Sequence, residues 1–143
     1  MVAGGAGGVG LASAVDLRAA ASDVMIPTIR MVAADLAERA DFDLDSVDEL
    51  RIAVHETCAL LVRIAASDAQ LRCRFCVWPQ RVQLAAEVGI DDMSDPLPVG
   101  SIGWWVLNCF ADEVNALVLP AEPGQHGRVC LALVKDSVIM PRP

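Results

Sequence analysis

A histidine and a glutamate stand side by side at positions 55 and 56 of the 143-residue sequence, and this pair is the first candidate for chemistry. His55-Glu56 begins the H-E-x-x-H pattern of zinc hydrolases, in which two histidines one helical turn apart hold the metal. Position 59 is alanine and the second histidine is His126, so the zinc pattern is incomplete. The sequence also contains no G-x-S-x-G nucleophile elbow and no phosphate-binding Gly-Lys-Ser or Gly-Lys-Thr. Glu56 is therefore a lone carboxylate, either solvated or functional.

Five cysteines form the second group of reactive side chains. Their number is odd and no export signal is visible, so we expect reduced thiols in the cytoplasm. Cys73 and Cys76 form a C-x-x-C pair, but their run, LRCRFCV, is typical of a strand, in which positions three apart point to opposite faces. Ordinary packed side chains are expected there, with a metal or redox site as the alternative. Cys58, Cys109 and Cys130 lie in apolar stretches and are predicted to be core residues.

The helix that carries Glu56 is predicted to begin near Asp45 or Ser46, either of which can cap it, and to end near Ala65. One continuous stripe of this helix is predicted to face the core: Leu50, Ala53, Val54, Thr57, Cys58, Leu61 and Ala65. At about 100° per residue, a second stripe consists of Ile52, Glu56, Leu60 and Arg63. Because Leu60 is apolar, we expect a loop, a ligand or a partner to cover this second stripe.

The remaining elements alternate in a way that predicts the fold. Strands are expected at Ala14–Ala19, Leu71–Val77, Arg81–Val88, Val114–Leu119 and Arg128–Val134, and further helices from Ser22 or Asp23 to about Ala40 and from Ile102 to Ala111. The order β-α-α-β-β-α-β-β predicts an α+β fold, a single-domain two-layer sandwich with helices on one face of a mixed sheet. We expect a disordered tail at residues 1–13, one domain over 14–138 and a frayed end at 139–143.

Composition limits the class of partner. The chain is 55% hydrophobic and 21% charged, with a mean hydropathy of +0.45, which fits one globular domain and excludes wholesale disorder. No uninterrupted run of about 18 apolar residues predicts a transmembrane helix, so no membrane partner is expected. The net charge of −8 argues against direct binding of nucleic acid, which depends on neutralising phosphates, and favours a basic protein partner.

Two runs of the sequence resemble one family. The run DELRIAVHETCALLVRIA is similar to the helix that usually reads A-V-x-E-A-x-T-N-A in the anti-sigma factor serine kinases, through Ala53, Val54 and Glu56. The run SIGWWVLNCFADEV resembles the family's G-M-G-F…D-D-V helix, through Gly103, Trp104 and Asp112-Glu113-Val114. The family belongs to the histidine-kinase-like, or Bergerat, ATPase superfamily. The resemblance covers about residues 14–134 and implies a histidine-kinase-like ATPase domain.

The resemblance implies roles for two residues of the Glu56 helix. Glu56 takes the place of the family's general base, which helps a substrate serine attack the γ-phosphate of ATP. Position 60, where the family has an asparagine that binds Mg²⁺, is Leu60, whose side chain offers no oxygen to the metal. Arg63, one turn further on, either neutralises a phosphate or is an ordinary surface arginine.

Three further motifs of the nucleotide site depart from the family pattern. Glu87-Val88-Gly89 takes the place of D-x-G, whose aspartate reads the adenine amino group; Ser101-Ile102-Gly103 takes the place of G-x-G; and Gly127-Arg128 takes the place of a Gly-Thr. The implied nucleotide-contacting residues are Glu56, Leu60, Glu87, Gly89, Ile102 and Gly103. ATP binding is thus expected to be weak or lost and Mg²⁺ binding to be impaired, since metal bridging of phosphates is central to phosphoryl transfer.

The resemblance also implies partners. Arg30 matches a basic position on the family's sigma-binding helix; an ordinary exposed arginine is the alternative. The implied function is that of a cytoplasmic, homodimeric anti-sigma factor in transcription regulation and stress response. It would sequester an alternative sigma factor until an anti-anti-sigma factor releases it. Two hypotheses stay open, an active ATP-dependent protein serine kinase and a binding module without the chemistry, and Leu60 favours the second. A thiol protein built on Cys73 and Cys76 is a third.

Overall fold

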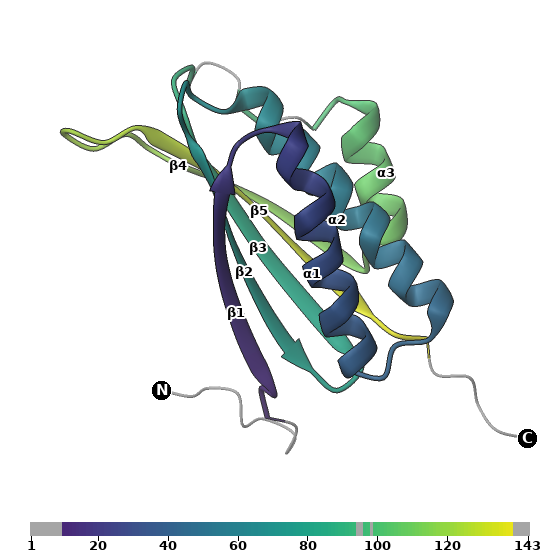
Figure 1. Ribbon diagram of the computed structural model, residues 1–143. Helices are drawn as coiled ribbons and strands as arrows, with labels where there is room; N and C mark the ends of the chain where they lie inside the picture. The colour runs from purple at the N-terminus through teal and green to yellow at the C-terminus, as the bar shows by residue number, and fades with distance from the viewer. Residues whose placement is uncertain (1–9, 94–95, 98, 139–143) are drawn as a thin grey trace, which may run out of the picture.

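The computed structural model describes residues 10–93, 96–97 and 99–138. Its elements are β1 (Ser13–Ala20), a short 3-10 helix (Asp23–Met25), α1 (Ile26–Arg39), α2 (Leu44–Ile64), β2 (Gln70–Trp78), β3 (Arg81–Ile90), α3 (Ile102–Phe110), β4 (Glu113–Leu119) and β5 (Gly127–Asp136). They form two layers, a five-stranded sheet in the order β1-β2-β3-β5-β4 and three helices that cover one of its faces (Figure 1). The predicted α+β sandwich is therefore confirmed.

The sheet is antiparallel at every strand pair, whereas a mixed sheet was expected. The connections explain the difference. Between β1 and β2 the chain passes through two helices, α1 and α2, so it returns to the sheet in the opposite direction. The single helix α3 does join two strands of the same direction, β3 and β4, but β5 lies between them.

Strict alternation along the strands separates the two faces of the sheet. In β3 the residues buried against the helices are Val82, Leu84, Ala86, Val88 and Ile90. The residues between them point to the opposite side, which we call the open face; on β3 it carries Gln83, Ala85 and Glu87. The period of two fixes which side chains can meet the helices.

The helix α2 begins two residues earlier than the sequence indicated, with Asp43 as its N-cap. Asp43 Oδ2 accepts a hydrogen bond from the Ser46 backbone N–H (3.1 Å), and Asp43 Oδ1 accepts from the Ser137 hydroxyl (2.8 Å) and the Val138 N–H (3.2 Å). Hydrogen bonds from Ser46 and Ser137 lower the pKa of Asp43 to about 2. The cap thus also ties the residues that follow β5 to the start of α2.

The ends of the chain are only partly covered by the structure. Residues 1–9 and 139–143, to which most of the expected tail and the frayed end belong, lie outside the described residues. Pairing starts before position 14: the Ala12 N–H donates to the Val77 carbonyl (2.7 Å), and Ser13 is the first residue of β1. Within the described part of the chain, no helix is long and apolar enough to cross a membrane.

The cysteines divide between the two faces of the sheet and the helices. Cys73 is buried under the helices and Cys76 lies on the open face, as the alternation along β2 predicted. Cys58 is buried, as expected. The prediction was wrong for Cys130, which is half-buried on the open face. It was also wrong for Cys109, which is exposed, because α3 has more apolar residues than the one face that packs on α2 can bury.

Candidate functional site

The helix α3 packs on α2 at the residue that the sequence places in the glycine motif. A Cβ atom built on Gly103 would lie 3.0 Å from Glu56 Oε1 and 3.2 Å from Leu60 Cδ2, closer than ordinary van der Waals contact. The absence of a side chain at Gly103 therefore allows the close approach of the two helices without a shift of Glu56 or Leu60. Leu60 is 1% exposed and belongs to the core. A loop, a ligand or a partner was expected over the second stripe of α2; the structure shows instead that the helix α3 covers it at Leu60, whereas Ile52 and Arg63 stay exposed.

Glu56 lies beside this contact and is half-buried. The first turn of α3 is capped by Ser101, whose hydroxyl accepts a hydrogen bond from the Trp104 N–H (3.1 Å). Ile102, in the same turn, is 82% exposed and points away from α2. Of the predicted nucleotide residues, the structure thus brings Glu56, Leu60 and Gly103 together, with Ile102 beside them but facing solvent.

Glu87 and Gly89 do not join this group. Glu87 lies on the open face, where its carboxylate accepts a hydrogen bond from Arg128 Nη1 (3.0 Å). Glu87, together with Arg18, Arg72 and other residues, borders a hollow of about 500 Å³ on that face. Gly89 follows Glu87 by two residues on β3, and its carbonyl accepts from the Ala66 N–H (2.8 Å).

The sheet therefore separates Glu87 from Glu56. The sequence analysis placed both in one nucleotide site, and the geometry does not allow this arrangement. The cause is the period of two along β3. Val88 and Ile90 face the helices, so the residues on either side of Val88, Glu87 and Gly89, are directed to the open face.

The residues on the helical side do not fit a magnesium nucleotide. Mg²⁺ requires oxygen ligands in octahedral geometry, and Leu60 fills the implied ligand position with hydrocarbon packed on Gly103. Glu56 is the one carboxylate of the predicted set on this side. In the part of the chain that the structure describes, no three His, Cys, Asp or Glu side chains gather closely enough to hold a metal ion. Arg63, the other candidate for contact with a phosphate, is exposed.

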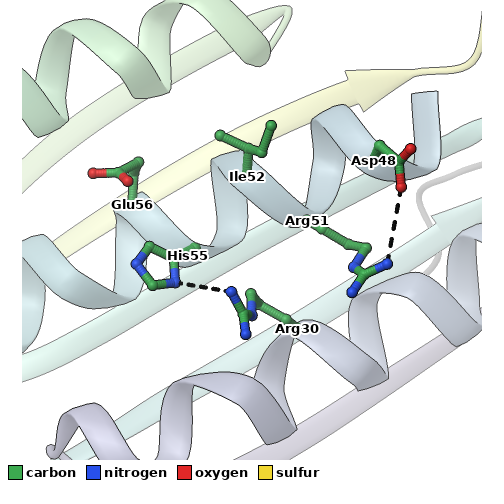
Figure 2. A pocket seen from close by; sticks show the side chains of 6 residues that line it. All are labelled: Arg30, Asp48, Arg51, Ile52, His55 and Glu56. Carbon is green, nitrogen blue, oxygen red and sulfur yellow. Dashed lines mark hydrogen bonds and ion pairs between the residues drawn. The ribbon is translucent and has the colours of Figure 1, made fainter. Parts of the chain in front are cut away.

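A second group of side chains lies on the outer side of α2, where it faces α1. Figure 2 shows Arg30 of α1 and His55 of α2 pointing toward each other, with Arg30 Nη1 3.3 Å from His55 Nδ1. They border a cavity of about 420 Å³ lined by Arg30, Asp48, Arg51, Ile52, His55 and Glu56. Arg51 faces Asp48 at 3.8 Å, and Ile52 is 38% exposed. The cavity is open, charged and partly apolar.

Arg30 differs from the ordinary surface arginine that was the alternative interpretation. It is half-buried, and its Nε atom is buried without a hydrogen-bond partner among the described residues. The sequence analysis considered His55 only as a zinc ligand and missed its contact with Arg30. No local signal could have shown this contact, because the two residues are 25 positions apart in sequence and meet only through the packing of α1 on α2.

The comparisons with known proteins agree with this architecture. The chain is 33% identical to the anti-sigma-F factor RsbW of Mycobacterium tuberculosis over 117 residues, which cover 81% of this chain and 68% of the relative. It is 22% identical to the serine-protein kinase RsbW of Bacillus cereus over 122 residues, which cover 72% of this chain and 76% of the relative. A search against models of known protein families finds no match. The identity and coverage of the mycobacterial relative show that the chain belongs to the RsbW family of anti-sigma factors and serine-protein kinases.

Proposed function

We propose that the protein is an anti-sigma factor that sequesters an alternative sigma factor by direct binding and no longer depends on phosphoryl transfer. The relative named anti-sigma-F factor RsbW supports the binding role. One observation carries the loss of chemistry: Leu60 is buried against Gly103 where a metal ligand would be needed. An anti-anti-sigma factor would then release the sigma factor by competing for an overlapping surface.

The partner surface in this proposal includes Arg30 on α1. Its guanidinium lines the open cavity between α1 and α2 and has no ion-pair partner within the described part of the chain. The net charge of −8 suits the basic regions of a sigma factor and would accelerate association. We further propose a cytoplasmic homodimer, as the family resemblance implies.

A second candidate function is an active serine kinase that phosphorylates its antagonist. The relatives named serine-protein kinase RsbW support it, as does Glu56, a half-buried carboxylate at the position of the implied general base. This alternative requires another oxygen to replace the ligand that Leu60 cannot supply. It therefore predicts turnover of about one per second or faster, as is usual for kinases.

A pull-down from the native cytoplasm, followed by mass spectrometry, identifies the sigma factor and the antagonist. Purified partners then separate the two functions. Binding of the sigma factor in the absence of ATP, with no measurable phosphorylation of the antagonist, supports the proposed anti-sigma role. Rapid phosphorylation contradicts it, and absence of sigma binding contradicts both functions.

Arg30→Glu tests the partner surface. We expect this variant to weaken sigma binding by roughly 30-fold or more, because it places a like charge opposite the acidic group that Arg30 would receive. Arg39→Glu is the matched control, since Arg39 lies on the same helix, is 76% exposed and pairs only with Asp35 among the described residues. Calorimetry measures both affinities. Equal affinities of folded Arg30→Glu and wild type would remove Arg30 from the interface.

A further inference from the structure

The contact between Arg30 and His55 has one possible direction as a hydrogen bond. A guanidinium has only N–H donors and no acceptor, so the 3.3 Å contact requires His55 Nδ1 to accept. A ring nitrogen that accepts leaves the positive charge of Arg30 without a counter-charge, whereas a carboxylate in the place of His55 would neutralise it.

One donor of Arg30 is not satisfied within the described residues. Its Nε is buried without a partner, and none of the ion pairs found there includes Arg30. Asp48, which also lines the cavity, faces Arg51 instead. A buried donor without an acceptor is unfavourable, so the guanidinium is held in the free protein at some cost. Because Nε is buried, an acceptor from outside would have to pair with the Nη atoms of Arg30.

The chemistry of the cavity indicates which acceptor fits. Two guanidinium groups, Arg30 and Arg51, and two carboxylates, Asp48 and Glu56, line it. Arg51 faces Asp48, so Arg30 is the guanidinium without an ion pair among the described residues, and a guanidinium binds a carboxylate through two parallel hydrogen bonds. The partly exposed side chain of Ile52 offers apolar contact to the methylenes of a glutamate or aspartate. A volume of about 420 Å³ accommodates such a side chain with its neighbours.

We propose that His55 is a positioning residue for partner binding: it holds the Arg30 guanidinium turned into the cavity, where Arg30 receives a carboxylate of the sigma factor. The inference rests on the proposed function, because it assumes that Arg30 contacts this partner. His55 itself makes no contact with the partner in this arrangement. Its contribution is to reduce the number of conformations that Arg30 must give up on binding.

The test is a double-mutant cycle on the full chain, with the sigma factor recovered in the pull-down as the probe. His55→Leu removes the acceptor, and His55→Asn keeps an oxygen near the position of Nδ1. We expect His55→Leu to weaken binding roughly tenfold and His55→Asn to stay within about threefold of wild type. In an Arg30→Ala background, His55→Leu should cause no further loss, because no guanidinium remains to be positioned.

A second readout in the free protein separates the failure of this inference from that of the proposed function. The exchange rate of the Arg30 Nε–H, followed by nitrogen-resolved NMR, should rise in His55→Leu and stay low in His55→Asn. If the exchange of the Arg30 Nε–H depends on His55 but neither wild type nor variants bind a sigma factor, the proposed function is wrong, and so is the assignment of the sigma factor as partner. If the sigma factor binds and Arg30→Ala weakens this binding, but His55→Leu changes neither the affinity for the sigma factor nor the exchange of the Arg30 Nε–H, the positioning role is wrong. Losses that add in the double variant contradict it as well.

Discussion

Replacing Leu60 by asparagine restores the side chain that the family uses to bind Mg²⁺, and the structure predicts that the replacement fails. Leu60 is 1% exposed and packs on Gly103. The variant loses the burial of a leucine side chain, about 1.5–3 kcal/mol, and buries an amide with incomplete hydrogen bonding, about 1–3 kcal/mol. The expected loss is therefore about 3–5 kcal/mol, a large part of the roughly 5–15 kcal/mol by which a domain is stable.

Thermal unfolding followed by circular dichroism measures this loss. At this chain length a destabilisation of about 3–5 kcal/mol corresponds to a fall in Tm of roughly 10–20 °C. Leu60→Met is the control, because it conserves volume and should cost less than about 1.5 kcal/mol. Gly103→Val, which pushes α3 away from α2, should also lower the Tm, and by less in a Leu60→Ala background where space is available.

Addition of ATP and Mg²⁺ completes this experiment. A ligand that binds only the folded state raises its stability, so binding would appear as a higher Tm. We expect no rise for wild type or for Leu60→Asn, since Glu87 lies on the opposite face of the sheet from Glu56. A Leu60→Asn variant that melts like wild type and is stabilised by ATP with Mg²⁺ would refute the closed α2–α3 contact.

Two further predictions concern groups outside this contact. In native protein without reductant, a thiol reagent should modify Cys109 first and reach the buried Cys58 and Cys73 only after unfolding, with five thiols in total; three or fewer would indicate a disulfide. The pKa of Asp43 is lowered to about 2 in the fold, below its unfolded value of about 3.9, so its stabilising effect is present above that value and disappears as the pH falls from about 4 to 2. Urea unfolding of wild type and Asp43→Asn should therefore differ at pH 7 and converge near pH 2, and an unchanged difference would contradict the stabilising effect of the Asp43 charge, since asparagine also caps helices.

The sequence predicted the elements and the two layers of the fold because both depend on local patterns, whereas the antiparallel pairing of all the strands was not predicted. Alternation along the strands and the stripe of α2 predicted every helix and strand, and the ends of most, to within a few residues. The N-cap of α2 was misplaced because Asp43, Asp45 and Ser46 are all competent caps. What selects Asp43 is its contact with Ser137, which is 94 residues away in sequence.

The candidate site was harder to predict because it depends on how elements pack. The sequence indicated that Leu60 is covered, but not that Gly103 covers it. This contact depends on two helices packing closely at a residue without a side chain. Glu87 matched a motif by position, yet the face on which it lies is set by the register of β3 with its neighbours. His55 belonged only to an incomplete zinc pattern, and its contact with Arg30 follows from the packing of α1 on α2.

Glu56 distinguishes the two functions, because it belongs to both groups of side chains. Its Oε1 atom lies beside Gly103, and its side chain also lines the cavity with Arg30. In a kinase, Glu56→Gln removes the general base and abolishes phosphorylation while sigma binding stays unchanged. In the binding protein proposed here, the same change removes a negative charge from the rim of a cavity that receives a carboxylate. Sigma binding should then tighten by roughly two- to fivefold at low salt, with the gain shrinking as salt screens the charge. Unchanged or weaker binding by Glu56→Gln would show that the partner places no carboxylate in this cavity.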